Sequence, residues 1–186
     1  MRIIFQGGNV MYNTGRMIGI IIGIIIGLLI CLVIFRFFNK DGKMKTQYDE
    51  MQELIRGRGY RYSFFTILIC EAALIPLSVG GVRLPLNAAC LHFAIIFIGV
   101  VVQATYCIFH DAYVGLNTNM KRFMLVMVIA AVINFASAFA AIAGREMIID
   151  GQLQAPFINL LCGLLLVILA IELFIKKMID TRAEGN

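Results

Sequence analysis

Three residues of this chain could bind an ion or a proton. They are one carboxylic acid and two amides, and each lies inside an apolar stretch. Glu71 lies near the middle of one apolar run, and Asn134 and Gln103 lie inside two others. An ionised carboxylate at such a depth in a membrane costs about 3 kcal/mol, so it must face other polar groups or carry a proton. A hydrogen bond between Glu71 and Asn134, joined by Gln103, is compatible with their expected depths. The set predicts either a proton or cation site or a protonated link between helices.

The other reactive residues do not form a catalytic or metal-binding pattern. Glu172 lies four residues before Lys176, a spacing that predicts an ordinary i,i+4 ion pair. Asp49, Glu50 and Glu53 have no His or Cys near them in the sequence, so we expect no metal site there. The five cysteines each lie inside an apolar run without a CxxC pattern, which is typical of packing thiols. We therefore expect no enzyme activity, no metal and no cofactor.

The composition decides which class of protein surrounds these residues. The chain has 186 residues, of which 61% are hydrophobic and 15% charged, and its mean hydropathy is +0.89. A soluble domain is nearer 45–50% apolar and about 25% charged, so this composition excludes a sizeable soluble catalytic domain. The net charge of +5 does not indicate nucleic acid, because seven of the 16 basic residues lie between Arg36 and Arg61, directly after an apolar run. A basic cluster in that place sets membrane topology and contacts anionic lipid.

Five apolar runs predict five transmembrane helices, at residues 17–38, 62–82, 87–109, 123–143 and 155–175. Each run has about 20 residues and crosses a hydrocarbon core of about 30 Å at about 1.5 Å per residue. Lipid requires such segments to satisfy their own backbone hydrogen bonds, so they are helices. We therefore predict an all-α membrane bundle in a single domain, with residues 39–61 as a cytoplasmic juxtamembrane segment. Pro76 is expected to loosen the second helix near its end.

The distribution of basic residues predicts the orientation of this bundle. Twelve lysines and arginines lie on one side of the predicted membrane and four on the other. The positive-inside rule then places the N-terminus outside and the C-terminus in the cytoplasm. The expected location is the plasma membrane of a bacterium, since Gln6-Gly7-Gly8-Asn9 can be encoded by a bacterial ribosome-binding sequence placed for initiation at Met11. Residues 1–10 would then precede the true start.

Four glycines in the first apolar run form the clearest helix-packing pattern. Gly15, Gly19, Gly23 and Gly27 recur every four residues and therefore lie on one helix face. Membrane helices associate through such small residues, because close approach of the backbones supplies the contact. The face suits either dimerisation or a neighbouring helix of the same chain. We expect the second, because four other helices are available.

The juxtamembrane segment carries one distinctive polar motif, Tyr48-Asp49-Glu50-x-Gln52 followed by Arg56. Apolar residues of this segment fall on one face of a short helix. Its acids precede its bases, as the helix dipole favours. The motif predicts either a docking surface for a cytoplasmic protein, formed by Tyr48, Asp49, Glu50, Gln52 and Arg56, or an anchor that only fixes topology.

These residues, continued by Arg56-Gly57-x-Gly59-Tyr60, resemble a YDExQ…RGxGY juxtamembrane signature of small multi-pass membrane proteins from Gram-positive anaerobic bacteria. The usual form of the first element has Arg where this chain has Met51. The resemblance implies a bacterial plasma-membrane protein. It assigns no activity and no site residues, because those families carry no established activity.

Two classes of function remain open. The first is a non-enzymatic scaffold, sensor or accessory subunit, which fits the short loops and the scarcity of reactive groups. The second is a small permease or ion-coupled carrier that uses Glu71. Expected partners are the lipid bilayer and either a second copy of the chain or a cytoplasmic protein, but not nucleic acid. Glu71→Gln separates the classes, because a carrier loses coupling whereas a hydrogen-bonding link tolerates the neutral isostere.

Overall fold

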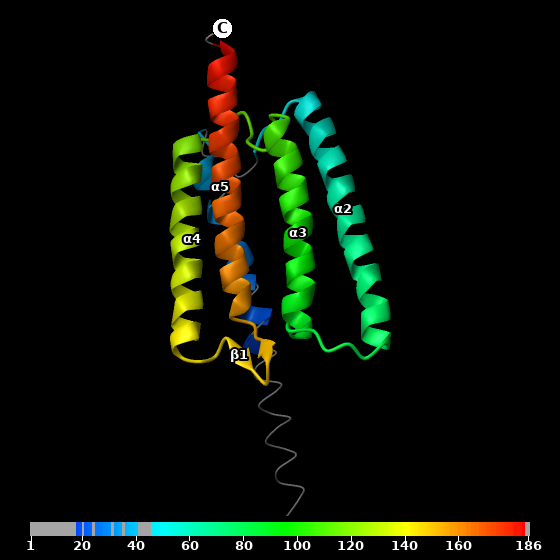
Figure 1. Ribbon diagram of the computed structural model, residues 1–186. Helices are drawn as coiled ribbons and strands as arrows, with labels where there is room; N and C mark the ends of the chain where they lie inside the picture. Colours follow the sequence, from blue (N-terminus) through cyan, green and yellow to red (C-terminus); the bar gives the residue numbers. More distant parts are fainter. Residues whose placement is uncertain are drawn as a thin grey trace, which may run out of the picture. The chain divides into compact units, whose positions relative to one another are not determined.

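The protein is mostly helical in a computed structural model that describes residues 18–19, 21–23, 25–30, 32–34, 36–40 and 46–184 (Figure 1). Its elements are the helices α2 (Glu50–Val79), α3 (Ala88–Phe109), α4 (Met120–Ala143) and α5 (Phe157–Glu184), and the short strands β1 (Ile148–Ile149) and β2 (Gln152–Leu153). With the helical run Ile21–Phe38, the described residues contain five helices long and apolar enough to cross a membrane. The expected number of such helices is confirmed.

Contacts between Cα atoms divide the chain into two compact units. The first is Met1–Thr46 with Asn117–Asn119, and the second is Gln47–Leu116 with Met120–Asn186. Within the described part of the first unit, residues 38–40 pair with 117–119 through an antiparallel bridge between Asn39 and Thr118. The Asn119 N–H donates to the Phe38 carbonyl at 2.7 Å. This pairing fixes the short segment 117–119 to the end of the first apolar run.

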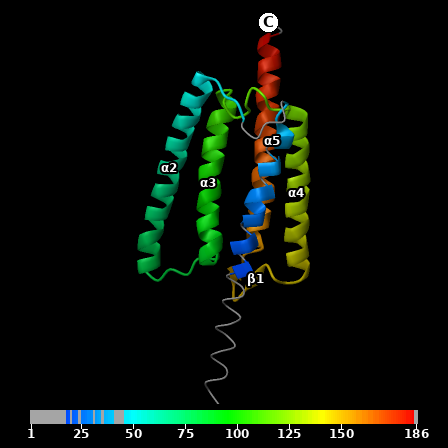
Figure 2. The same ribbon diagram turned by 180° about the vertical axis from the view of Figure 1, so that it is seen from behind.

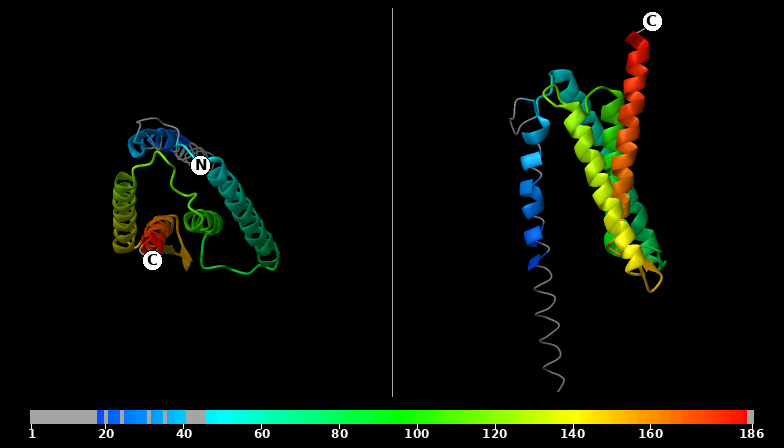
Figure 3. Two further views of the ribbon diagram at one scale, coloured as in Figure 1. Left: turned by 90° about the horizontal axis from the view of Figure 1, so that it is seen from above. Right: turned by 90° about the vertical axis from the view of Figure 1, so that its left-hand side faces the viewer.

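The four helices of the second unit pack in the order α2, α3, α5, α4 (Figures 1 and 2). Seen along their length, these four helices form a single row and not a closed ring (Figure 3, left). The shared core is small and lies where α3, α4 and α5 meet; its buried residues are Ala104, Ile108, Met127, Leu169 and Leu173. Most of the remaining apolar surface of the row is exposed, as lipid or a neighbouring membrane protein requires.

Helix α2 begins twelve residues before the expected second span, at Glu50 and not at residue 62. The juxtamembrane segment and the span are therefore one continuous helix of 30 residues, about 45 Å long at about 1.5 Å per residue. Asp49 caps its N-terminus, and Gly57 and Gly59 do not interrupt it. The separate short helix expected before residue 62 is wrong, because the cap and the acidic first turn start the long helix directly.

Helix α3 begins within one residue of its prediction, because Asn87 is its N-cap and accepts from the Cys90 N–H at 2.8 Å. Helix α4 starts at Met120, three residues before the predicted span. Helix α5 continues nine residues beyond Ile175, to Glu184. Its extension carries hydrogen bonds between residues one turn apart, including Thr181 Oγ1 to the Lys177 carbonyl at 2.9 Å.

Three of the helices end in the same turn, in which the chain passes through one left-handed residue. Gly81 takes this conformation after α2 with φ 69°, Asp111 after α3 with φ 58°, and Arg145 after α4 with φ 58°. Pro76 lies inside α2, and its carbonyl accepts from the Gly80 N–H at 2.9 Å. The helix ends at Val79, three residues after the proline and three residues before the predicted end at residue 82.

A hairpin between α4 and α5 was not predicted from the sequence. Strands β1 and β2 pair antiparallel, and the two residues between them are Asp150 (φ 51°) and Gly151 (φ 76°). Two consecutive positive φ angles define a type I′ turn, for which Asp-Gly is a preferred dipeptide. The described residues are therefore mostly helical, as expected, and this four-residue sheet is an exception that the Asp150-Gly151 pair could have predicted.

Candidate functional site

The juxtamembrane motif forms a capping box at the start of α2. The Asp49 carboxylate accepts from the Gln52 N–H at 2.6 Å, and the Gln52 side-chain oxygen accepts from the Asp49 N–H at 3.3 Å. Such a reciprocal pair satisfies two backbone donors that the first turn of a helix leaves unpaired. The three-residue spacing of Asp49 and Gln52 was a readable signal for the start of a helix.

Two side chains of the motif also hold the loop between α3 and α4. Gln52 Nε2 donates to the backbone carbonyl of Asp111 at 2.6 Å, and to that of Val114 at 3.4 Å. Arg56 Nη1 donates to the carbonyl of Ala112 at 3.4 Å. We call Tyr48, Asp49, Gln52 and Arg56, with the backbone of residues 111–114, the juxtamembrane clamp. It fixes the first two turns of α2 to the end of α3.

Aromatic side chains surround the arginine of the clamp. The Arg56 guanidinium lies 4.0 Å from the centre of the Tyr48 ring, and Arg56 Nη2 donates to the Tyr60 hydroxyl at 3.1 Å. Burial raises the pKa of Tyr48 above its ordinary value of 10.0, although the nearby Arg56 charge opposes this shift. Cation–π contacts of this kind contribute about 0.5–1 kcal/mol at exposed sites and more where water is excluded.

Helix α5 holds the same loop from its other side. Lys176 Nζ lies 3.0 Å from the Asp111 carboxylate and also pairs with Asp180 one turn along α5. The loop residue Tyr113 is largely buried, and burial raises its pKa to about 12. Residues 111–114 are therefore held by side chains from two helices, and they link the cytoplasmic ends expected for α2, α3 and α5.

The outward face of the first turns of α2 remains open. Glu50, Glu53, Leu54, Gly57, Arg58 and Arg61 line an open hollow of about 750 Å³ along one side of the helix. Leu54 is 64% exposed, and a Cβ placed at Gly57 would meet no atom within 4 Å. We call these six residues the open stripe. Of the five residues expected to bind a partner, Glu50 belongs to this stripe, whereas the other four belong to the clamp.

A second polar site lies between α2 and α3, at the opposite end of the pair. The Nδ1 atom of His92 lies 2.9 Å from Glu71 Oε1 and 3.1 Å from Oε2. The two side chains are only partly covered, with exposed fractions of 57% for His92 and 36% for Glu71. The turn between α2 and α3 makes these helices neighbours and places His92 opposite Glu71.

The structure does not join Glu71 to Asn134 and Gln103. Asn134 Nδ2 donates to the Ala130 carbonyl of its own helix at 2.8 Å. Gln103 Nε2 donates to Cys107 Sγ, one turn along α3, at 3.4 Å. The expected three-residue set is therefore wrong in its geometry. Helix α4 packs on α5, at the far side of the row from α2, so similar depth in the membrane does not bring Asn134 to Glu71.

Glu172 also has a different partner from the one expected. Thr105 Oγ1 donates to Glu172 Oε1 at 2.7 Å, which links α3 to α5. The other carboxylate oxygen of Glu172 is buried and has no hydrogen-bond partner among the described residues. Lys176 pairs instead with Asp111 and Asp180, so the predicted i,i+4 pair with Glu172 is wrong.

The closest helix contacts use glycines other than those of the first apolar run. A Cβ at Gly99 would lie 2.5 Å from the Ile67 side chain, and one at Gly59 would lie 3.1 Å from Cys107 Sγ. A Cβ at Gly163 would lie 2.9 Å from the Phe135 ring. These contacts join α2 to α3 and α4 to α5. The pairs of helices thus approach closely at single glycines and not along a repeated glycine face.

The repeated glycines of the first apolar run have no close neighbour among the described residues of their own unit. No atom of those residues lies within 4 Å of a Cβ placed at Gly19, Gly23 or Gly27, and Gly15 lies outside the described residues. Their proposed role in helix packing stays a prediction.

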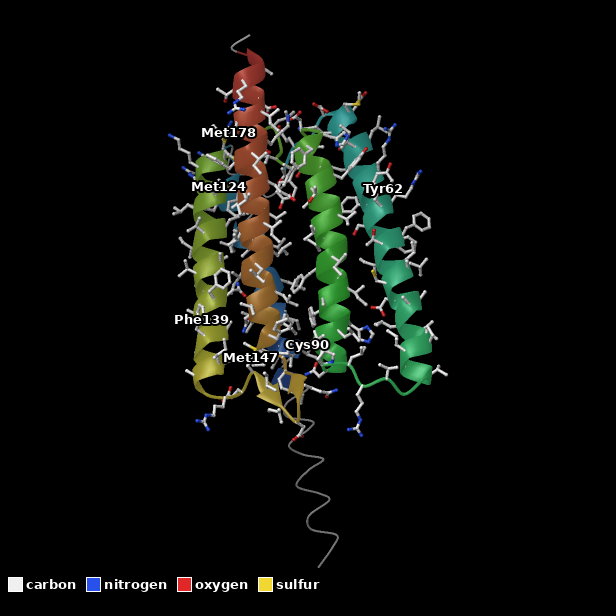
Figure 4. The ribbon with its side chains drawn as sticks, in the orientation of Figure 1. Tyr62, Cys90, Met124, Phe139, Met147 and Met178 are labelled. Atoms are coloured by element: carbon white, nitrogen blue, oxygen red, sulfur yellow. The ribbon has the colours of Figure 1, made fainter. Side chains whose placement is uncertain are left out.

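The buried cysteines lie at both ends of α3. Cys90 is fully buried beside the hairpin end, where its Sγ contacts the Gln154 carbonyl at 3.0 Å (Figure 4). Cys107 is fully buried under Gly59 at the clamp end. Cys70, Cys90, Cys107 and Cys162 are free thiols. In the described part of the chain, no group of three or more His, Cys, Asp or Glu side chains could hold a metal ion.

Comparison with known proteins finds no relative of this chain. No protein family, no curated protein and no solved structure matches the chain. The resemblance to the YDExQ…RGxGY proteins therefore stays a prediction. The clamp, the open stripe and the Glu71–His92 pair are the features that bear on function.

Proposed function

We propose that this protein is a non-enzymatic subunit of the bacterial plasma membrane, a scaffold or sensor that presents the open stripe of α2 to a cytoplasmic protein. The observation that supports the proposal is that the residues of the juxtamembrane motif lie on two sides of α2. Gln52 and Arg56 bind the backbone of residues 111–114, while Glu50, on the other side of the helix, lines the open hollow. The clamp holds the helix, and the stripe is free to bind.

The length of α2 supports this role. A span of about 20 residues suffices for the hydrocarbon core, whereas α2 has 30 residues. About ten residues at its N-terminus, which include most of the open stripe, therefore project beyond the core. The count of basic residues favours a cytoplasmic position for this end. A helix that is fixed in advance loses little conformational freedom when a partner binds, which favours affinity.

The charges of the stripe indicate the chemistry of the partner. Glu50 and Glu53 lie in the first turn of α2, and Arg58 and Arg61 lie further along the helix, closer to the expected hydrocarbon core. Two copies inserted in the same direction would align these helices in parallel and bring like charges together, which is unfavourable. The stripe therefore suits a different protein, with basic residues away from the membrane and acidic residues next to the lipid head groups.

The proposal is tested by crosslinking the tagged full chain in its native membranes and identifying what co-purifies by mass spectrometry. The stripe variant reverses four charges, with Glu50→Lys, Glu53→Lys, Arg58→Glu and Arg61→Glu. We expect the wild type to retain a cytoplasmic protein in fixed stoichiometry and the stripe variant to lose it. The matched control is Lys121→Glu, an exposed reversal at the start of α4, which should retain the protein.

Two outcomes of this experiment contradict the proposal. One is that no cytoplasmic protein co-purifies with the wild type in fixed stoichiometry. The other is that the stripe variant and Lys121→Glu retain the same protein equally well. Thermal unfolding of each variant in detergent is measured alongside, because the stripe substitutions face solvent and should leave the fold intact.

The Glu71–His92 pair favours a second candidate, an ion-coupled carrier. Ionisable residues inside membrane segments commonly mark proton or ion pathways. In this case the purified chain in liposomes should move protons or a coupled solute, and Glu71→Gln should abolish the coupling at unchanged expression. Liposomes that show no transport with the wild-type chain would exclude the carrier.

A further inference from the structure

The pair of Glu71 and His92 is incompletely satisfied within one chain. His92 uses Nδ1 for the contact with Glu71, and its Nε2 atom has no hydrogen-bond partner among the described residues. More than half of the His92 side chain is exposed. The pair lies eight residues before the end of α2 and four residues after the start of α3, within segments that are apolar enough to cross a membrane.

An imidazole nitrogen that faces lipid needs a hydrogen-bonding partner. Each unsatisfied polar group in hydrocarbon costs several kcal/mol, because no water is present to replace the missing bond. Several polar side chains of the spans are already engaged: Asn134 and Gln103 bond within their own helices, and Thr105 bonds Glu172. Residues 17–35 contain no polar side chain at all. No described residue of the chain binds His92 Nε2, so a group from a second molecule would satisfy it.

A second copy of the chain supplies the matching groups at the right depth. Two copies inserted in the same direction are related by a two-fold axis along the membrane normal, so each residue lies at the same depth as its counterpart. Glu71 and His92 lie at nearly the same depth, because they are in direct contact. Across the axis, the acid of one copy can therefore meet the imidazole of the other.

We propose that this face of α2 and α3 is a homodimer interface, centred on a ring of two Glu71 and two His92 side chains. Within each copy, Nδ1 of His92 donates to Glu71. Between copies, Nε2 of His92 donates to Glu71 of the second copy. In this ring, each imidazole nitrogen of His92 has a carboxylate partner. The proposal goes beyond the function proposed above, since it concerns a different surface and a different partner.

The test uses variants that separate pairing within a copy from pairing between copies. Glu71→His places two imidazoles at the site, and His92→Glu places two carboxylates there. Neither variant alone can form the ring. A mixture can form it, because two imidazoles in one copy face two carboxylates in the other. We therefore expect each variant to associate about tenfold more weakly than the wild type, and the mixture to recover the association as a heterodimer.

Association is measured by energy transfer between donor-labelled and acceptor-labelled full chains in liposomes of phosphatidylethanolamine and phosphatidylglycerol. The double variant Glu71→His with His92→Glu keeps the pair within each copy and should dimerise as the wild type does, which guards against loss of fold. His110→Gln, a histidine at the other end of α3, is the matched control and should leave the dimer unchanged.

The proposal is overturned if the wild type remains monomeric at high protein-to-lipid ratio. It is also overturned if the mixture associates no better than the separate variants, since the pair would then act only within each copy. Both results are independent of whether the open stripe captures a cytoplasmic protein, so this inference and the proposed function can fail separately.

Discussion

The two ends of the α2–α3 pair are held together in different ways. At the clamp end, Gln52 and Arg56 bind backbone carbonyls that cannot move away, and Gly59 lies directly against Cys107. At the other end, the contact rests on Glu71 and His92, which remain partly exposed. At the clamp end, the polar side chains have their hydrogen-bond partners within the chain. At the Glu71–His92 end, the Nε2 atom of His92 has no partner among the described residues. This difference distinguishes the end that the chain fixes by itself from the end where we propose a second copy.

Between these ends, helices α2 and α3 pack closely at Gly99. We expect the stability of the protein to be most sensitive to substitution at this contact. A Cβ there would lie 2.5 Å from Ile67 and 3.0 Å from Ser63 Oγ. We expect Gly99→Ala to lower the free energy of unfolding by about 1–3 kcal/mol, because the added methyl group overpacks the contact. The measurement is thermal or chemical unfolding in detergent.

Gly57→Ala is the matched control for Gly99→Ala. Gly57 lies in the same helix pair but faces open space, so alanine should stabilise α2 by about 0.5–1 kcal/mol through its better helix propensity. Equal effects of the two substitutions would show that the approach at Gly99 is not close in the folded protein.

The next largest losses of stability are expected from two substitutions, each of which removes contacts at one end of α3. Arg56→Ala removes the hydrogen bond to the Ala112 carbonyl and the contact with Tyr48, at a cost of about 1–2 kcal/mol. Asn87→Ala removes the N-cap of α3 and the bond to Gln154 at the hairpin end, at a cost of about 1 kcal/mol.

Limited proteolysis distinguishes these two variants, because each should expose only its own end of α3. Arg56→Ala should favour cleavage in residues 110–116, and Asn87→Ala should favour cleavage in residues 83–87 and 147–154. Cleavage at both ends in either variant would argue against two independent attachments.

The smallest effect concerns the ionisation of Tyr113. Its pKa in the folded protein is about 12 because of burial, whereas its ordinary value is 10.0. The raised pKa means that folding favours the neutral phenol, so this contribution to stability is complete below pH 10 and is lost as the pH rises through 12. Phenol absorbance should show a late titration that Tyr113→Phe removes. A titration unchanged by that substitution would place Tyr113 in solvent.

The sequence predicted the helices better than their contacts. The apolar runs identified every long helix, and Asn87 marked the start of α3 because its side chain caps the first turn. The start of α2 was missed because Asp49 and Gln52 were interpreted as a docking motif, although their spacing forms a capping box. The hairpin was missed although Asp150-Gly151 is a preferred type I′ turn.

The partner of Glu71 could not be found from depth alone. Many polar residues share a depth in a bundle, and only the order of the helices decides which of them meet. The turn between α2 and α3 makes these helices neighbours and brings His92 to Glu71, whereas Asn134 lies on α4 at the far side of the row. Sequential helices joined by a short loop were the better guide, since such helices usually pack together.

Hydrogen exchange in the first turns of α2 tests most directly the claim that the juxtamembrane motif is an internal clamp. The full chain is compared in lipid nanodiscs with Gln52→Ala and with the control Leu54→Ala, which alters an exposed residue of the open stripe. Slow exchange is expected for residues 53–59 in the wild type and the control, and exchange about tenfold faster in Gln52→Ala, as the loss of about 1.4 kcal/mol would give. Equal exchange in all three proteins would contradict the account.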